Sequence, residues 1–332
     1  MKPFDKPAID IHAQLALLKQ RGLIIQDEDK ALCFLEAVSF FRLTPYMRSF
    51  QQPADSNHAF KTGTRLRDLT RLYDFDRRLR LLVMDAIERI EVASRAAISN
   101  HMGPVHGAHW YLQQRLFHDD YRHQELLDGI RRKQEKARQD HQRECRRIEA
   151  SKASPERKQN LVNQRAKESY ARHYALNYNQ PDLMPAWAAM EELTFGDLSH
   201  LFKGLKRDAD RKAIGRLLGL PGPLLQSWLH TLTSIRNICA HHSRLWNREL
   251  GIRPELPKTV GFPWPQYLQQ PGPHARTSTV LSILNLLMRR VSPHTSWDRR
   301  LHQLFSDFPE INLQAMGLPL SWKEDPFWQL LD

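Results

Sequence analysis

The sequence is short of cysteine, with only Cys33, Cys145 and Cys239 in 332 residues and no CxxC pair. This scarcity argues against a disulfide framework and against a zinc ribbon, and it suits a reducing compartment such as the cytoplasm. No apolar run approaches the roughly 18 residues that a membrane span needs. The N-terminus also lacks the apolar core of a signal peptide, so we expect a cytoplasmic protein without membrane contact.

Several signals of common enzyme folds are absent as well. Strand patterns are nearly missing, and there is no Gly-rich phosphate loop, GxSxG elbow or HExxH motif. Histidines gather between residues 101 and 123, but Gly103, Pro104 and Gly107 predict a loop there, and no Asp or Cys stands at metal-ligand spacing. We therefore predict an all-α protein that uses no metal and no other cofactor.

Positive charge is what the sequence has in excess. Lys and Arg number 49 against 37 Asp and Glu, which gives a net charge of +12. Such a field favours polyanions, of which nucleic acid is the commonest soluble example, although a generally basic protein would show the same balance. Over half of the excess lies in residues 121–173, where 15 basic residues face 8 acidic ones.

Residues 121–173 are also poor in apolar residues. A turn is expected at Ser151–Pro155 between two polar helices, so this stretch reads as a helical hairpin that projects from the core. It is either a solvated, partly mobile arm or a clamp on an RNA backbone, which would add affinity but no sequence choice. The predicted contacts are Arg131, Arg132, Lys133, Arg146 and Arg147.

The stretch with the clearest chemical pattern is residues 224–247, LLQSWLHTLTSIRNICAHHSRLWN. Apolar residues recur there at steps of three and four, which predicts an amphipathic helix, and Pro223 can occupy its first position. The polar face of this helix would carry His230, Ser234, Asn237, His241, Arg244 and Arg248.

Three residues of this stretch can converge on one phosphate. Asn237 and His241 are one turn apart, and the long side chain of Arg236 can reach round to them. Arginine offers a forked and permanently charged donor, and histidine is suited to proton transfer near neutral pH. The spacing alone is also compatible with a solvated helix face, because chance gives roughly five such Arg–His pairs in a chain with this composition.

Residues 64–100 predict a second long helix whose polar positions are almost all charged. One interpretation is ion pairing on the helix surface, as in Asp74–Arg78 and Glu91–Arg95. The other is a basic wall beside the helix of residues 224–247. In that case the RNA contacts would be Arg77, Arg80 and Arg95, joined by Arg244 and Arg248.

Several strings resemble the bacterial abortive-infection Abi family, the AbiD/AbiF-like proteins. They are LYDFDRRLR at 72–80 with IERIEV at 87–92, PAWAAMEELTFGDL at 185–198, and SWLH, IRNICAHH and RLWNR within 227–248. The N-terminal LLKQRGL and FFRLTPY are similar to that family too. Arg236, Asn237 and His241 also resemble the R-x(4–6)-H motif of HEPN-domain ribonucleases, in which a polar residue commonly follows the arginine.

These resemblances imply a HEPN-like helical bundle and a metal-independent endoribonuclease that acts as an abortive-infection or toxin-like phage-defence protein. The implied catalytic residues are Arg236, Asn237 and His241, arranged across a homodimer. We expect an N-terminal helical segment at 1–60, a core at 61–250, and a proline-rich linker with a C-terminal helical segment at 251–332. The family pattern is shorter than this chain around residues 121–173, so the resemblance implies that a basic helical insertion interrupts the core there, most clearly over residues 131–167.

Two other functions stay open on the sequence. The protein could bind RNA without cutting it, in a complex with a dedicated small noncoding RNA that keeps it catalytically silent. A DNA-binding regulator is a weaker alternative, because the sequence shows no short helix-turn-helix with a basic recognition helix.

Overall fold

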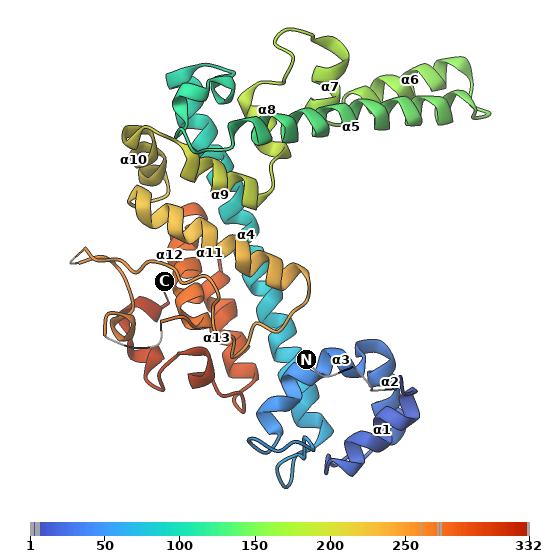
Figure 1. Cartoon of the computed structure of the whole chain (residues 1–332), viewed down its shortest axis with the longest axis vertical. Helices are drawn as coiled ribbons and strands as arrows, with labels where there is room; N and C mark the ends of the chain where they lie inside the picture. Colours follow the sequence, from blue (N-terminus) through green and yellow to red (C-terminus); the bar gives the residue numbers. More distant parts are fainter. Residues whose placement is uncertain (1–2, 4–6, 260, 271, 273, 331–332) are drawn as a thin grey trace.

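The computed structural model describes residues 3, 7–259, 261–270, 272 and 274–330, and within them it is built from helices alone (Figure 1). The described residues form thirteen α-helices and several 3-10 turns, with isolated β-bridges but no strand. The predicted all-α fold is therefore confirmed. The α-helices are α1 (Ile11–Gln20), α2 (Glu28–Val38), α3 (Phe40–Met47), α4 (Leu66–His106), α5 (His123–Glu149), α6 (Pro155–Ala166), α7 (Tyr170–Asn177), α8 (Ala186–Glu192), α9 (Phe195–Gly204), α10 (Asp208–Leu217), α11 (Gly222–Ala240), α12 (Thr277–Val291) and α13 (Trp297–Asp307).

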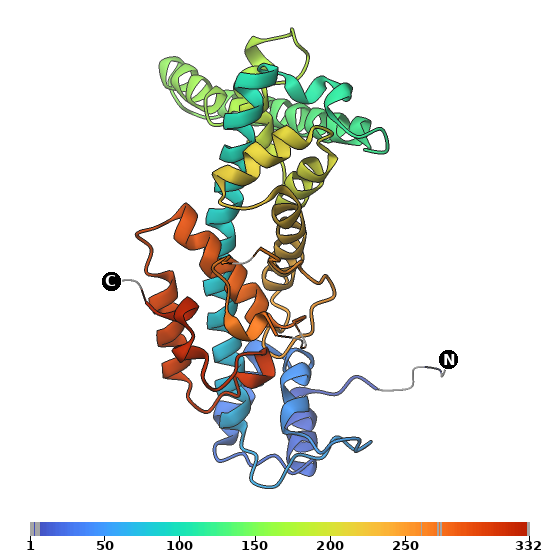
Figure 2. The same ribbon diagram turned by 90° about the vertical axis from the view of Figure 1, so that its left-hand side faces the viewer.

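Helix α4 is the axis of the molecule. Its 41 residues run along the long dimension, with the C-terminal helices α12 and α13 packed on it (Figure 2). Its apolar stripe is fully buried at positions such as Phe75 and Ile90. The Trp297 indole of α13 donates to the Leu82 carbonyl at 2.8 Å, which fixes the C-terminal segment to the same axis.

The predicted loop at Gly103–Pro104 is wrong, because α4 continues through both residues to His106. Two contacts explain why the last turn stays helical. His101 and His106 both hydrogen-bond the carboxylate of Asp210 in α10, at 2.8 and 2.9 Å. The helix stops only at Gly107, whose φ of 94° is a conformation that suits glycine.

Helices α1–α3 enclose a small hydrophobic core of their own at one end of α4 (Figure 1). Leu18 and Leu43 are buried in it together with Leu69 from the start of α4. Asp27 caps α2 by accepting from the Lys30 amide at 3.0 Å, as its position before the apolar pattern predicts.

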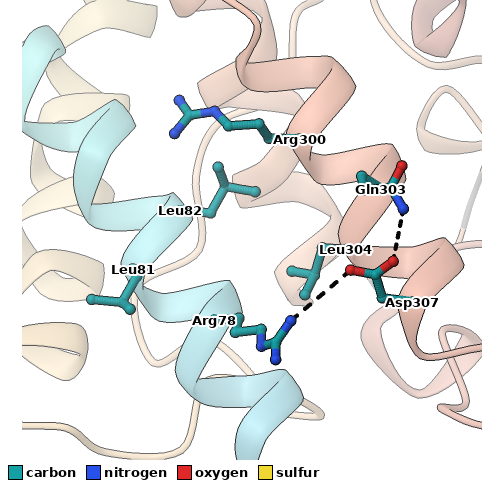
Figure 3. Close-up of a pocket in the computed structure, with 7 residues that line it drawn as sticks. All are labelled: Arg78, Leu81, Leu82, Arg300, Gln303, Leu304 and Asp307. Carbon is teal, nitrogen blue, oxygen red and sulfur yellow. Dashed lines mark hydrogen bonds and ion pairs between the residues drawn. The ribbon is translucent and has the colours of Figure 1, made fainter.

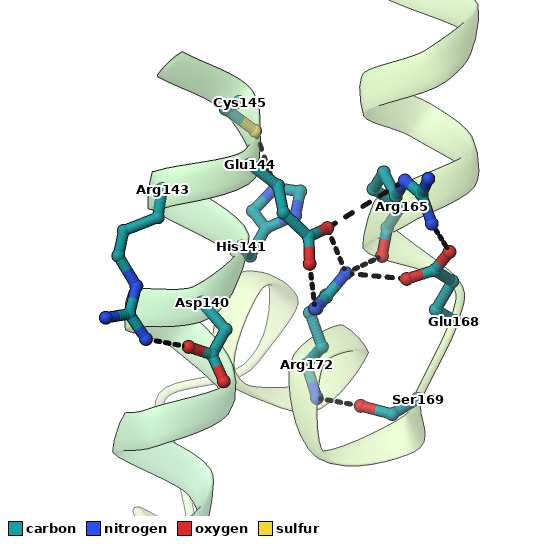
Figure 4. Close-up of polar contacts among 9 residues, drawn as sticks. All are labelled: Asp140, His141, Arg143, Glu144, Cys145, Arg165, Glu168, Ser169 and Arg172. Carbon is teal, nitrogen blue, oxygen red and sulfur yellow. Dashed lines mark hydrogen bonds and ion pairs between the residues drawn. The ribbon is translucent and has the colours of Figure 1, made fainter. Parts of the chain in front are cut away.

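Helices α5 and α6 form the predicted hairpin, which projects sideways at the other end of α4 (Figure 1). The hairpin is anchored by Arg172 of α7, which is buried, with 8% of its surface exposed. Its guanidinium donates to Glu144 at 3.1 and 3.3 Å, to Glu168 at 3.0 Å and to the Arg165 carbonyl at 2.7 Å (Figure 4). These bonds join α5, the end of α6 and α7 at one point, so the root of the arm is held in place.

No helix in the described part of the chain is both long and apolar enough to cross a membrane.

Candidate functional site

Helix α11 ends earlier than the sequence predicts. It stops at Ala240, with His241 as its C-cap, whereas the apolar pattern predicted a helix to Asn247. The stop is a Schellman turn in which the His242 amide donates to the Cys239 carbonyl and the Ser243 amide to the Ile238 carbonyl, both at 2.9 Å. Glycine usually occupies the left-handed position of such a turn, but here it is His242, with a φ of 56°.

Because α11 ends at Ala240, only part of its predicted polar face is helical. Asn237 and His241 remain one turn apart, since the His241 amide donates to the Asn237 carbonyl at 3.0 Å, and both residues are exposed. The Arg236 guanidinium approaches the Asn237 side-chain oxygen at 3.4 Å. Arg244 and Arg248, in contrast, lie beyond the turn and do not continue the helical face, so that part of the prediction is wrong.

A buried carboxylate fixes the chain that follows the turn. Asp76 of α4 is fully buried and accepts from the Trp246 amide at 2.6 Å, the Leu245 amide at 3.1 Å and the Tyr46 hydroxyl at 2.6 Å. Burial and the nearby Asp76 raise the pKa of Tyr46, so its hydroxyl stays a donor. Three segments far apart in sequence thus meet at one side chain.

Arg80 completes this buried group and is not available to RNA. Arg80 is 4% exposed, and its guanidinium pairs with Asp76 and donates to the Tyr46 hydroxyl at 3.0 Å. The prediction that Arg80 contacts RNA is therefore wrong, because an anion could reach it only by breaking the pair with Asp76.

Arginines surround the end of α11. Arg42 of α3 donates to the His242 carbonyl at 2.7 Å. Arg244 is half-buried, and its pKa is lowered first by burial and also by the neighbouring Arg248 and Arg48, against the opposing effect of Asp76. We call Arg42, Arg48, Arg236, Arg244 and Arg248 the arginine cluster.

The arginine cluster differs from the other arginines near it. Within the described residues, its members form no ion pair with a carboxylate, and the Arg248 guanidinium donates instead to the Arg244 carbonyl at 2.8 Å. The carboxylate that acts on Arg244, Asp76, is itself paired with Arg80. Like charges placed near one another repel, and a bound anion would relieve that repulsion. The end of α11 is therefore a candidate anion site.

The two other residues of α4 that were predicted to contact RNA do not belong to the arginine cluster. The Arg95 side chain is only 12% exposed and donates to the Leu193 and Met190 carbonyls at 2.7 and 3.0 Å, besides pairing with Glu91, so its prediction as an RNA contact is wrong. Arg77 is half-exposed and pairs with Asp74 at 3.1 Å. The ion pairs of the alternative interpretation, Asp74–Arg78 and Glu91–Arg95, are confirmed at 2.9 and 2.6 Å, although the second pair is largely buried rather than at the surface.

Of the five residues of the hairpin that were predicted to contact RNA, some already bind other groups of the protein. Arg131 pairs with Asp128 at 3.0 Å, and Lys133 donates to the Glu192 carbonyl. Arg132, Arg146 and Arg147 are exposed. Arg146 and Arg147 lie near the tip of the hairpin and Arg132 near its root, so the arm does not bring the three together.

Two hollows in the described part of the structure bear on the site. A small one of about 320 Å³ lies between α4 and α13 (Figure 3). Its polar groups already have partners, since Gln303 donates to Asp307 at 2.7 Å and Arg78 approaches the same carboxylate at 4.0 Å. Arg300, which also lines it, pairs with Asp85. The larger one, of about 1550 Å³, is a polar groove between α5, α9 and α11 that the sequence did not predict. His230 is the predicted α11 residue that lines it.

The described residues contain no group of three His, Cys, Asp or Glu side chains placed to hold a metal ion.

The fold is that of an all-α protein, and the comparison with known families agrees with the resemblance seen in the sequence. A family model described as Abi-like protein matches residues 33–247, about two thirds of the chain. The chain therefore belongs to the Abi-like protein family. Membership supports a role in abortive infection, a form of phage defence. No curated protein and no solved structure matches the chain.

Proposed function

We propose that this protein is a HEPN-type endoribonuclease that works without a metal ion in abortive infection. One observation carries the proposal: Asn237 and His241 are exposed at the end of α11, with Arg236 beside Asn237 and Arg42 bound to the carbonyl of His242. This combination offers a proton-transfer group and several positive charges to the same phosphate.

The chemistry uses the RNA's own 2′-hydroxyl as the nucleophile. His241 accepts its proton while the 2′-oxygen bonds to the adjacent phosphorus, and the bond from phosphorus to the 5′-oxygen breaks. The leaving 5′-oxygen takes up a proton, so the products end in a 2′,3′-cyclic phosphate and a 5′-hydroxyl. Arg236 stabilises the charge on the phosphate oxygens, and Asn237 holds the phosphate or orients His241.

The proposal includes a homodimer because the reaction needs two proton transfers. The motif supplies one candidate proton-transfer group per chain, His241, whereas one transfer removes a proton and the other delivers one. A second copy of the chain facing the end of α11 would supply the other His241. Exposure of Asn237 and His241 in the single chain leaves them free to face such a copy.

The products test this chemistry. We expect the purified protein to cleave single-stranded RNA in excess EDTA and to leave 2′,3′-cyclic phosphate ends. Such ends resist a ligation that requires a 3′-hydroxyl until the ring is opened and the phosphate is removed. Cleavage that stops in EDTA, or 3′-hydroxyl products, would contradict the proposed reaction.

The arm supports a second candidate, an RNA-binding protein held silent by a dedicated small noncoding RNA. Arg146 and Arg147 are exposed near the tip of the hairpin, away from α11, where a phosphate contact would add affinity without serving catalysis. RNA sequenced from protein purified without nuclease treatment distinguishes the two candidates. One discrete species would favour the silent complex, and random fragments would favour the free ribonuclease.

A further inference from the structure

We infer that the groove between α5, α9 and α11 binds the phosphates of a single RNA strand that flank the cleavage site. This inference rests on the proposed function, because it assigns the substrate of the same helix. At about 1550 Å³ the groove is larger than a pocket for a small ligand, which typically spans about 300–1,000 Å³.

Two histidines from different helices lie close together in the groove. His200 of α9 and His230 of α11 are both exposed, and their ring centroids lie 6.4 Å apart at 64°. Imidazole nitrogens on two separate helices at this separation can both reach the oxygens of one phosphate placed between them. Lys203, one turn after His200 on α9, lines the groove on the same side.

The opposite wall supplies more positive charge. Arg132 and Lys136 of α5 line the groove, are exposed, and form no ion pair among the described residues. One turn of α5 separates them, so they lie on one face of the helix. A strand in the groove would therefore meet cations from α5 on one wall and from α9 on the other.

Acidic residues also line the groove, but most of them already have partners. Glu125 pairs with Arg122 at 3.3 Å, and Asp128 pairs with Arg131 at 3.0 Å. Asp208 pairs with Lys212 at 2.7 Å. A further lining carboxylate, Asp197, caps α9 by accepting from the Thr194 amide at 2.9 Å. Asp197 also lies 3.8 Å from Lys133. The remaining two lining carboxylates, Asp120 and Glu255, form no ion pair among the described residues. Against these two negative charges stand the three unpaired positive charges of Arg132, Lys136 and Lys203.

Helix α11 connects the groove to the proposed catalytic end. His230 and Asn237 are seven residues apart, which places them on nearly the same face and about 10 Å apart along the helix axis. Ser234 lies between them on that face. A strand whose scissile phosphate sits at Asn237 and His241 would thus enter the groove at His230.

The test is a binding experiment that does not need cleavage. The probe is a fluorescein-labelled 2′-O-methyl RNA of roughly 12 nucleotides, within the range that single-strand-binding proteins cover. Its blocked 2′-oxygen cannot attack, so fluorescence anisotropy reports binding alone. The variants are His200→Ala/His230→Ala and Lys203→Gln, with His12→Ala/His294→Ala as a matched control because those two histidines are exposed and do not line the groove.

We expect the His200→Ala/His230→Ala protein to bind about tenfold more weakly, the loss of a hydrogen-bonded phosphate contact, and the control to bind like the wild type. Lys203→Gln should reduce the slope of log affinity against log salt by about 0.7, the value for one phosphate contact in a single strand. Unchanged affinity and slope in both groove variants would overturn the inference. So would a mononucleotide that competes as well as the oligonucleotide at equal phosphate concentration.

The same proteins separate this inference from the proposed function. If the wild type binds the probe through the groove but never cuts unmodified RNA, the ribonuclease proposal fails and the groove assignment stands. If unmodified RNA is cut at the same rate and with the same KM by the groove variants, the groove assignment fails and the ribonuclease stands.

Discussion

Replacing Asp76 with asparagine should be among the most destabilising changes on α4. The carboxylate accepts from two backbone amides, from the Tyr46 hydroxyl and from Arg80. Asparagine keeps one acceptor oxygen and places an amide N–H₂ where donors already point, while Arg80 is left charged and buried. Breaking a buried ion pair from one side costs about 3–5 kcal/mol. That is over a hundredfold in the unfolding equilibrium constant, since about 1.4 kcal/mol is tenfold.

Urea unfolding followed by tryptophan fluorescence would measure this change. The matched control is Asp74→Asn on the same helix, whose carboxylate pairs with Arg77 and Arg78 at the surface. Exposed pairs contribute about 1 kcal/mol at most, so the control should stay close to the wild type. If Asp76→Asn lowers the free energy of unfolding by less than about 1 kcal/mol, the account of this buried group is refuted.

Replacing Asp76 should also lower the proposed RNA cleavage. Asp76 holds the Leu245 and Trp246 amides just after the His241 turn. Asp76→Asn should therefore lower RNA cleavage even under conditions in which the protein remains folded, whereas Asp74→Asn should not.

Two further predictions concern the turn and the α4–α10 junction. His242→Gly should stabilise the fold by about 1 kcal/mol in urea unfolding, because glycine adopts the left-handed conformation without strain, and a loss of stability would contradict this. Burial raises the pKa of Asp210, but hydrogen bonds from His101 and His106 lower it more, so the folded pKa lies below the ordinary value. Asp210 thus contributes stability above about pH 4 that is lost in more acidic solution, and the stability gap between wild type and Asp210→Asn should shrink there rather than stay constant.

The helical fold was predictable because its signals are local. Apolar steps of three and four residues and N-caps such as Asp27 are properties of neighbouring positions. The end of α11 was not predictable from the same signals. Its left-handed stop is made by His242 rather than glycine, and it is supported by Arg42, 200 positions away in the sequence.

The same limit explains the errors in the predicted RNA contacts. Asp76 and Arg80 have the i,i+4 spacing of an ordinary surface pair, and only the Leu245 and Trp246 amides, about 170 positions away, reveal that the pair is buried. The groove depends on three helices that are distant in sequence, so His200 carried no signal until α9 was placed beside α11.

The most direct test of the central claim compares RNA cleavage by the wild type and by His241→Ala, with His294→Ala as the control. Removing a group that transfers a proton in the transition state costs about a hundredfold or more in rate. The account predicts that loss for His241→Ala, with binding of the 2′-O-methyl probe unchanged and with full activity in the control. Full cleavage by a folded His241→Ala protein would contradict the claim that the end of α11 is the catalytic site.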